Sequence, residues 1–64
     1  MPLEDAARAY RRAEKTLAER RTELASAIVE AARAGTRQVD IVKITGYTRE
    51  RVRQLLRDAG VDGT

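Results

Sequence analysis

The 64-residue sequence contains no cysteine and no histidine. Without cysteine it cannot form a disulfide framework, and without either residue it lacks the ligands of the usual zinc sites. Histidine and cysteine are also common catalytic groups, and remaining candidates such as Ser26 have no general base beside them in any helical arrangement. The sequence therefore predicts no catalytic site, no metal and no cofactor.

Aromatic residues and long apolar stretches are also scarce. Phe and Trp are absent, which leaves Tyr10 and Tyr47 as the only rings able to stack on single-stranded nucleic acid. No apolar stretch approaches the roughly 20 residues of a membrane span, and Glu4 and Asp5 have the wrong charge for a signal peptide. We expect one small, soluble, cytoplasmic domain with neither a membrane nor a small-molecule partner.

Helix-forming residues fill the first half of the chain. From Leu3 to Ala34 there is no Gly or Pro, and Ala, Arg, Glu and Leu dominate. Pro2 stands where helices commonly begin, and Gly35 stands where they commonly end. The pattern predicts one long helix over this stretch.

Apolar residues recur along the predicted helix at intervals of seven. One row consists of Leu3, Tyr10, Leu17, Leu24 and Ala31, and a second row, offset by three, of Ala6, Ala13, Arg20, Ala27 and Ala34. Two such rows form the seam of a coiled coil or of a helix lying along a partner.

The seam divides the chain into two predicted parts. Residues 1–21 form a helical extension that we interpret as a dimerisation arm, because a single helix of this length is marginal in water unless its apolar stripe is covered. Residues 22–64 form a trihelical domain. The predicted contacts of the homodimer are Leu3, Tyr10, Leu17 and Leu24. The alternative is a solvated or frayed arm without a partner.

After Gly35 the pattern is that of two short helices joined by a turn. Thr36 is a suitable N-cap for a helix over 37–45. Gly46 can adopt the positive φ of the turn, and Thr48 can cap a third helix that runs to about residue 59. The inward-facing residues are Ile41, Val42 and Thr45 in the second helix and Val52, Leu55 and Leu56 in the third. We predict an all-α fold, with a long helix followed by a helix-turn-helix.

Positive charge is concentrated in the second half of the chain. The net charge is +3, but residues 37–57 contain six basic and two acidic residues, whereas residues 1–34 contain seven and six. A phosphate-binding face requires such a local excess. Arginine-rich helices can also be ordinary solvated surfaces, and this alternative remains open.

The third predicted helix carries side chains that can read DNA bases. Arginine can donate two hydrogen bonds to guanine, glutamate can accept one from cytosine, and glutamine can bond adenine. The predicted base-reading residues are Arg49, Glu50, Arg53 and Gln54, and the predicted phosphate-binding residues are Thr36, Arg37, Gln38, Lys43, Thr48, Arg51 and Arg57. Alternatively, Glu50 only favours the helix dipole and pairs with Gln54 or Arg53.

The segment Thr48-Arg-Glu-Arg-Val-Arg-Gln54 resembles the recognition-helix segment of region 4.2 in primary bacterial sigma factors. Gly46 and Ile41, five positions earlier, also match that pattern. Residues 38–57 are similar to the helix-turn-helix of small bacterial regulators and recombinase DNA-binding domains. Sigma factors are far longer, so the resemblance indicates a similar DNA reader and not a sigma factor.

The resemblance implies a role for individual residues. Arg49 is expected to read guanine, Glu50 to accept from cytosine, and Gln54 to contact a base. Thr48 and Gln38 are expected to anchor the phosphate backbone.

These observations predict a small dimeric transcriptional regulator, associated with the nucleoid, that binds double-stranded DNA. Two-fold symmetry predicts an inverted repeat with half-sites about one helical turn, or a multiple of it, apart. The alternative is a helical protein-interaction module, such as a coiled-coil adaptor or an antitoxin-like partner, which could dock on RNA polymerase. Its docking surface requires exposed apolar residues, and only Val39 and Ile44 are surplus to the core.

Overall fold

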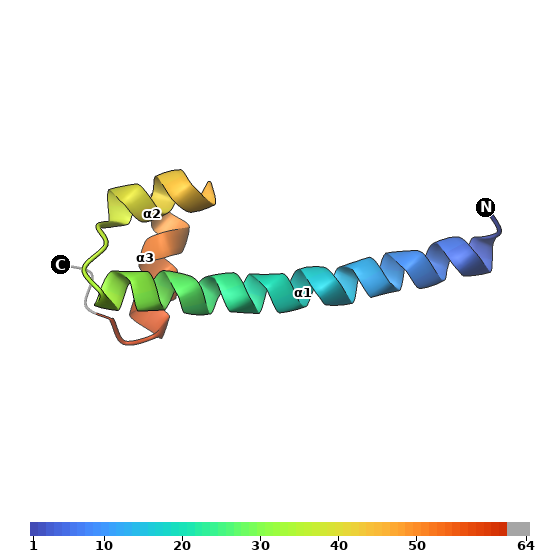
Figure 1. The fold of residues 1–64 in the computed structure, drawn as a ribbon, viewed down its shortest axis with the longest axis horizontal. Helices are drawn as coiled ribbons and strands as arrows, with labels where there is room; N and C mark the ends of the chain where they lie inside the picture. The colour runs from blue at the N-terminus through green and yellow to red at the C-terminus, as the bar shows by residue number, and fades with distance from the viewer. Residues whose placement is uncertain (62–64) are drawn as a thin grey trace.

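In a computed structural model, residues 1–61 are described and form three helices (Figure 1). Helix α1 spans Leu3–Arg33, α2 spans Gln38–Thr45, and α3 spans Arg49–Asp58. The predicted fold class is confirmed, because the described chain is all-helical with a long amino-terminal helix followed by two short ones. The last three residues of the predicted domain over 22–64 lie outside the described part of the chain.

Helix α1 ends in a Schellman motif that determines the role of Thr36. The backbone N–H of Gly35 donates to the carbonyl of Ala32 at 3.1 Å, with Gly35 at φ 101°. The backbone N–H of Thr36 donates to the carbonyl of Ala31 at 2.9 Å. The prediction that Thr36 caps α2 is therefore wrong. Thr36 belongs to the end of α1, and the N-cap of α2 is Arg37, whose side chain makes no capping hydrogen bond.

A turn of three residues joins α2 to α3 and is held by two threonines. Gly46 ends α2 at φ 75°, the left-handed conformation predicted for it. The Thr45 hydroxyl donates to a carbonyl one turn earlier at 2.7 Å and accepts from the backbone N–H of Tyr47 at 3.1 Å. The Thr48 hydroxyl accepts from the backbone N–H of Arg51 at 3.1 Å, so the predicted cap of α3 is confirmed.

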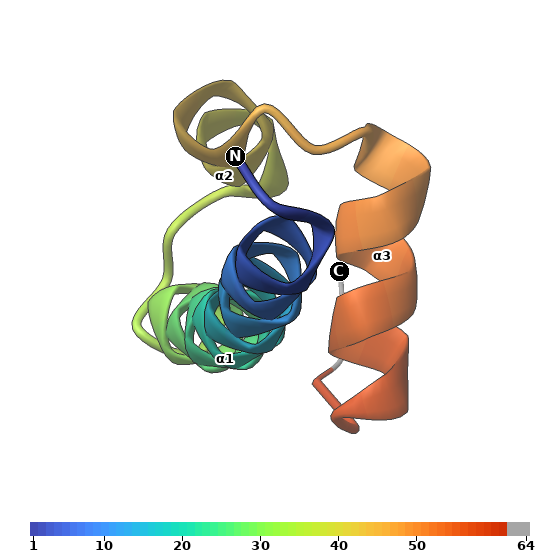
Figure 2. The ribbon, with the colours of Figure 1, turned by 90° about the vertical axis from the view of Figure 1, so that its right-hand side faces the viewer.

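The three helices meet around a small core at the carboxyl end of α1. Viewed along α1, α2 and α3 lie on adjacent sides of it, and each helix contacts the other two (Figure 2). The buried side chains are Ile28, Ile41, Val52 and Leu56. Half-buried apolar residues surround them: Leu24, Val29, Ala31, Ala32, Val42, Tyr47, Leu55 and Val61. The predicted inward faces of the two short helices are thus confirmed.

The amino-terminal part of α1 extends beyond this core as a single helix, which gives the molecule a length of 51 Å against a width of 20 Å (Figure 1). We call residues 1–21 the arm and residues 22–61 the head. In the arm, Leu3, Tyr10 and Leu17 are 79%, 66% and 50% exposed. Leu24 instead packs against the core of its own chain. None of the three described helices has an apolar stretch that could cross a bilayer.

We expect Gly46→Val to destabilise the head by about 1–3 kcal/mol, because a β-branched residue is strained at positive φ. An added Cβ meets no atom within 4 Å, so the cost arises from the backbone and not from crowding. Urea unfolding followed by circular dichroism measures the loss. Gly46→Asn is the control, since asparagine tolerates this conformation. An unchanged midpoint for Gly46→Val would contradict the assigned turn.

Candidate nucleic-acid interface

Helix α3 presents its polar face to solvent because its apolar face is fixed on the core. Val52 is fully buried and Leu56 is 2% exposed. Successive residues are about 100° apart around a helix, so Glu50, Gln54 and Arg57 project from the side opposite Val52. All three are exposed. The burial of two side chains therefore determines which residues of α3 can meet a ligand.

Four arginines lie on the exposed surface of α3. Arg49, Arg53 and Arg57 follow one another at intervals of four, which places them in one row along the helix. Arg51 lies on the other edge of the exposed face. Within residues 1–61, no ion pair holds Arg49 or Arg57. These two guanidinium groups are available to an anionic partner without breaking an internal contact.

The predicted base-reading residues Glu50 and Gln54 each have a neighbour on α3. A Glu50 carboxylate oxygen lies 3.7 Å from Nη1 of Arg53, and both side chains are more than half exposed. Nε2 of Gln54 donates to Oδ1 of Asp58 at 2.9 Å. Exposed pairs of this kind stabilise a helix little, so both side chains can exchange them for a ligand. Sequence analysis missed Asp58, although its spacing of four from Gln54 is a known pairing distance.

A second contact that sequence analysis missed lies at the start of α3. The guanidinium carbon of Arg51 sits 4.6 Å from the centre of the half-buried Tyr47 ring, a cation–π contact. The backbone N–H of the same arginine is bound by Thr48. Arg51 is thus held beside the amino end of the helix, where the helix dipole adds partial positive charge.

The predicted phosphate-binding residues of α2 lie at its two ends. Lys43 is exposed in the last turn, which leads directly into the turn before α3. Arg37 is exposed at the other end of α2, where its Nε lies 3.8 Å from Oδ2 of Asp40. Thr36 and Gln38 are half-buried beside it. Lys43, Thr48 and Arg51 therefore form a group near the start of α3, while Thr36, Arg37 and Gln38 form a separate group.

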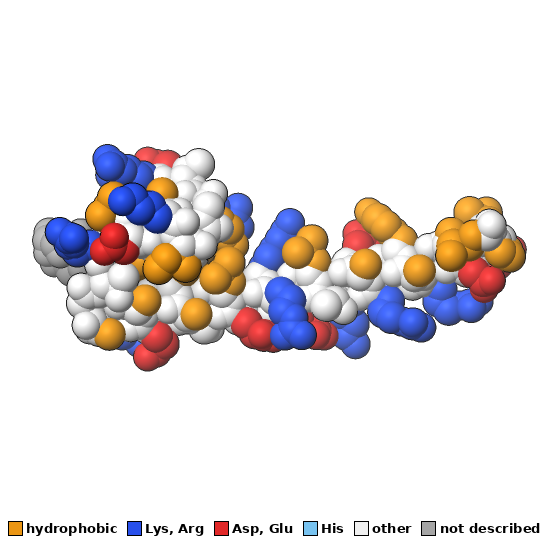
Figure 3. All heavy atoms as spheres, turned by 45° about the horizontal axis from the view of Figure 1, so that its top comes forward, with side chains coloured by type: hydrophobic (Ala, Val, Ile, Leu, Met, Phe, Trp, Pro, Cys, Tyr) orange, Lys and Arg blue, Asp and Glu red, His pale blue; other side chains and the backbone are white. Residues whose placement is uncertain are grey.

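The surface of α3 is open and not enclosed. A shallow depression along it is lined by Thr48, Glu50, Arg51, Gln54 and Leu55. In the face of the molecule drawn in Figure 3, Lys and Arg side chains lie on the head together with Asp and Glu side chains. No group of His, Cys, Asp or Glu in the described chain could hold a metal ion.

Comparison of the chain with protein-family models, curated proteins and solved structures gives no match. The function of the interface therefore has to be inferred from its own residues.

We expect Thr48→Ala to lower the stability of the head by about 1 kcal/mol, because the first turn of α3 loses its capping acceptor. Thr48→Ser retains the hydroxyl and should unfold at nearly the same urea concentration as the parent. Equal midpoints for the alanine and serine variants would show that the observed Thr48–Arg51 bond of 3.1 Å contributes nothing.

Proposed function

We propose that the protein binds double-stranded DNA sequence-specifically and acts as a small dimeric transcriptional regulator. The observation that carries this proposal is the exposed face of α3, which combines four arginines with Glu50 and Gln54 on a helix that protrudes from its core. The major groove of B-DNA is about 12 Å wide and admits one α-helix. This face therefore carries the donors and acceptors that a reading helix needs.

The base-reading residues lie in the amino-terminal half of α3, the part of the recognition helix that enters the major groove in helix-turn-helix proteins. Arg49 has no ion pair within residues 1–61 and donates to guanine. Arg53 does the same one turn later. Glu50 orients Arg53 in the free protein and accepts from cytosine in the complex. Gln54 exchanges its hydrogen bond to Asp58 for a hydrogen bond to a base edge.

The phosphate contacts fall to the residues that flank this half. Thr48 and Arg51 lie at the amino end of α3, where backbone N–H groups and the helix dipole also favour an anion, and Lys43 lies in the last turn of α2, just before the turn that leads to α3. Arg57 lies at the other end of the basic row. Thr36, Arg37 and Gln38 reach the backbone only if the duplex extends along α2.

The second candidate is a helical protein-interaction module, such as a coiled-coil adaptor or an antitoxin-like partner that docks on RNA polymerase. Ile44, which is 80% exposed at the end of α2, favours this candidate, and Val39 is 38% exposed. A single exposed isoleucine is common on monomer surfaces. The charged face of α3 is the larger and more specific feature, so DNA binding is the better supported function.

The deciding experiment is a mobility-shift titration of the protein with random-sequence duplexes at two salt concentrations, followed by selection of the bound duplexes over several rounds. We expect binding that weakens steeply with salt, since phosphate contacts release counterions. We also expect one enriched motif. Absence of binding at the lower salt concentration would reject the proposal in favour of a protein partner.

Substitutions should separate base reading from phosphate binding. Arg49→Ala should cost about 1–3 kcal/mol on the selected duplex and relax the preference at one guanine, with a smaller loss on random DNA. Arg57→Ala or Lys43→Ala should weaken binding to every duplex and lower the salt slope by about one unit. Equal losses for Arg49→Ala on selected and random DNA would exclude it as a base-reading residue.

A further inference from the structure

The arm carries an apolar stripe that no other part of the described chain covers. Leu3, Tyr10 and Leu17 stand at intervals of seven and are at least half exposed. The second row, offset by three, contributes the small residues Ala6 and Ala13. In Figure 3 most apolar side chains of the arm lie along its upper edge, with basic and acidic side chains among them, and further basic side chains lie along the lower edge. An isolated helix with such a stripe gains stability chiefly by covering it.

We propose that the arms of two copies pair antiparallel, with Leu17 of one chain opposite Ala6 of its partner and Tyr10 opposite Ala13. Leu3 then faces the stem of Arg20. The layers of Leu17 with Ala6 and of Tyr10 with Ala13 each contain one large and one small side chain, so the two helices remain evenly spaced there. Parallel arms would instead stack leucine on leucine and alanine on alanine, which requires the separation to widen and narrow within each heptad.

The charges on one flank of the stripe fit this antiparallel register. In this register Arg21 lies opposite a point on the partner helix that is two residues, or about 3 Å, from the partner's Glu4. Glu14 comes to lie at the same offset from the partner's Arg11. Both contacts join opposite charges. In a parallel pair the corresponding flanking positions contain uncharged Ala9 and Thr16, which supply no such pairing.

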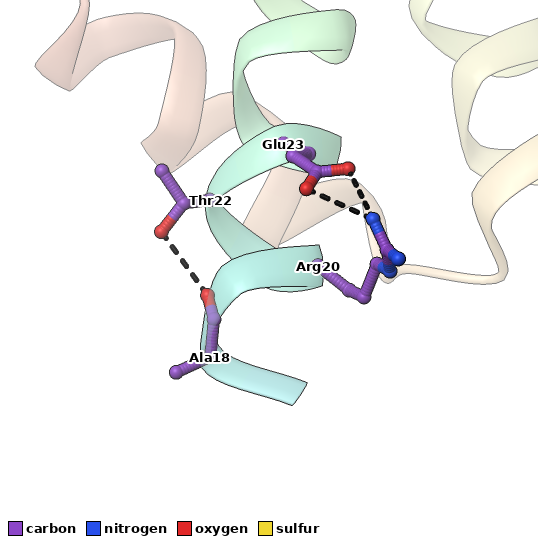
Figure 4. Close-up of polar contacts among 4 residues, drawn as sticks. All are labelled: Ala18, Arg20, Thr22 and Glu23. Atoms are coloured by element: carbon purple, nitrogen blue, oxygen red, sulfur yellow. Dashed lines mark hydrogen bonds and ion pairs between the residues drawn. The ribbon is translucent and has the colours of Figure 1, made fainter. Parts of the chain in front are cut away.

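The charges on the opposite flank also fit this register. Arg20 lies opposite a point on the partner helix that is two residues from the partner's Asp5. In the single chain, Nη1 of Arg20 contacts both carboxylate oxygens of Glu23, at 2.9 and 3.0 Å (Figure 4). Asp5 pairs with Arg8 at 3.3 Å. All four side chains are more than half exposed, so these contacts contribute little and can be exchanged or shared when the arms pair.

The position of the head excludes parallel arms. Leu24 and Ala31 continue the row of Leu17 and pack against the core, and Ile28, between them on α1, is buried there. The head therefore occupies the same side of α1 as the seam, and parallel arms would force two heads into one space. In the antiparallel register the partner's first residue lies opposite Thr22, so the partner helix ends where the head begins.

The orientation can be measured with single-cysteine variants of the full chain, because the sequence has no cysteine of its own. Thr22 is exposed and lies away from the seam. Spin labels on Thr22→Cys should be separated by about 30 Å, from 21 residues at 1.5 Å each. In parallel arms the labels would be separated only across the pair, by about two helix diameters or roughly 20 Å, and a separation near that value would overturn the proposal. A protein that sediments as a monomer at micromolar concentration, with no measurable coupling between labels, would overturn it too.

The register can be tested by exchanging charges and measuring the dimer Kd by sedimentation. Glu4→Arg with Asp5→Arg should raise Kd about tenfold, since contacts on both flanks become repulsive. Adding Arg20→Glu and Arg21→Glu to that variant should restore it. Lys15→Glu, on the side away from the seam, is the control and should leave Kd unchanged. Failure of the second pair of substitutions to restore Kd would overturn the register.

A third variant tests the stripe itself. Leu17→Glu should give a monomer at concentrations where Thr22→Glu remains a dimer, and circular dichroism should show that the head is still folded. A Leu17→Glu dimer as tight as the parent would overturn the proposal. The inference deepens the proposed dimer, but these measurements contain no DNA. A failure of arm pairing is thus distinct from a failure of duplex binding by the head.

Discussion

The burial of four side chains at the carboxyl end of α1 is the contact on which the rest of the molecule depends. Ile28 supplies the surface on which α2 and α3 close, and Val52 and Leu56 hold α3 against it. A chain this small gains little from its core, while the entropy cost of ordering each residue is undiminished. Hydrogen bonds at helix ends, such as the Thr48 cap, therefore carry a larger share of the stability than in a larger domain.

The same core determines the chemistry of the surface. Because Val52 is fully buried, the rotation of α3 about its axis is fixed, and a shift of one residue would turn the helix by about 100°. Such a turn would remove Glu50 and Gln54 from the exposed side. The packing of apolar residues thus specifies which polar residues a ligand can reach, although none of the buried side chains can contact that ligand.

Much of the fold could be predicted from the sequence, because its signals are local. The intervals of apolar residues predicted the three helices, Gly46 predicted the turn between α2 and α3, and Thr48 predicted the N-cap of α3. Thr36 was misassigned because a threonine after a glycine suits two roles, and the Schellman motif of α1 takes precedence over capping α2. Boundaries differ by about one residue for the same reason, since the groups at helix ends have competing partners.

The side-chain contacts of the interface could be predicted less well. Glu50 has two partners at helical spacing, and rotamers, not spacing, decide that it contacts Arg53 while Gln54 contacts Asp58. The stacking of Arg51 on Tyr47 also depends on where the turn places the ring. Base-reading and phosphate-binding roles remain predictions, because they depend on a partner that the fold of the single chain does not contain.

The straightness of α1 makes the arm a spacer as well as a contact. In the proposed antiparallel register, the two Ile28 positions are 33 residues apart, or about 50 Å at 1.5 Å per residue. One turn of B-DNA spans about 34 Å, so this separation corresponds to about one and a half turns. Major grooves that far apart on a straight duplex face opposite directions. In such a dimer the spacing of the two heads is set by the length of the arm and by its register, and not by contacts within either head.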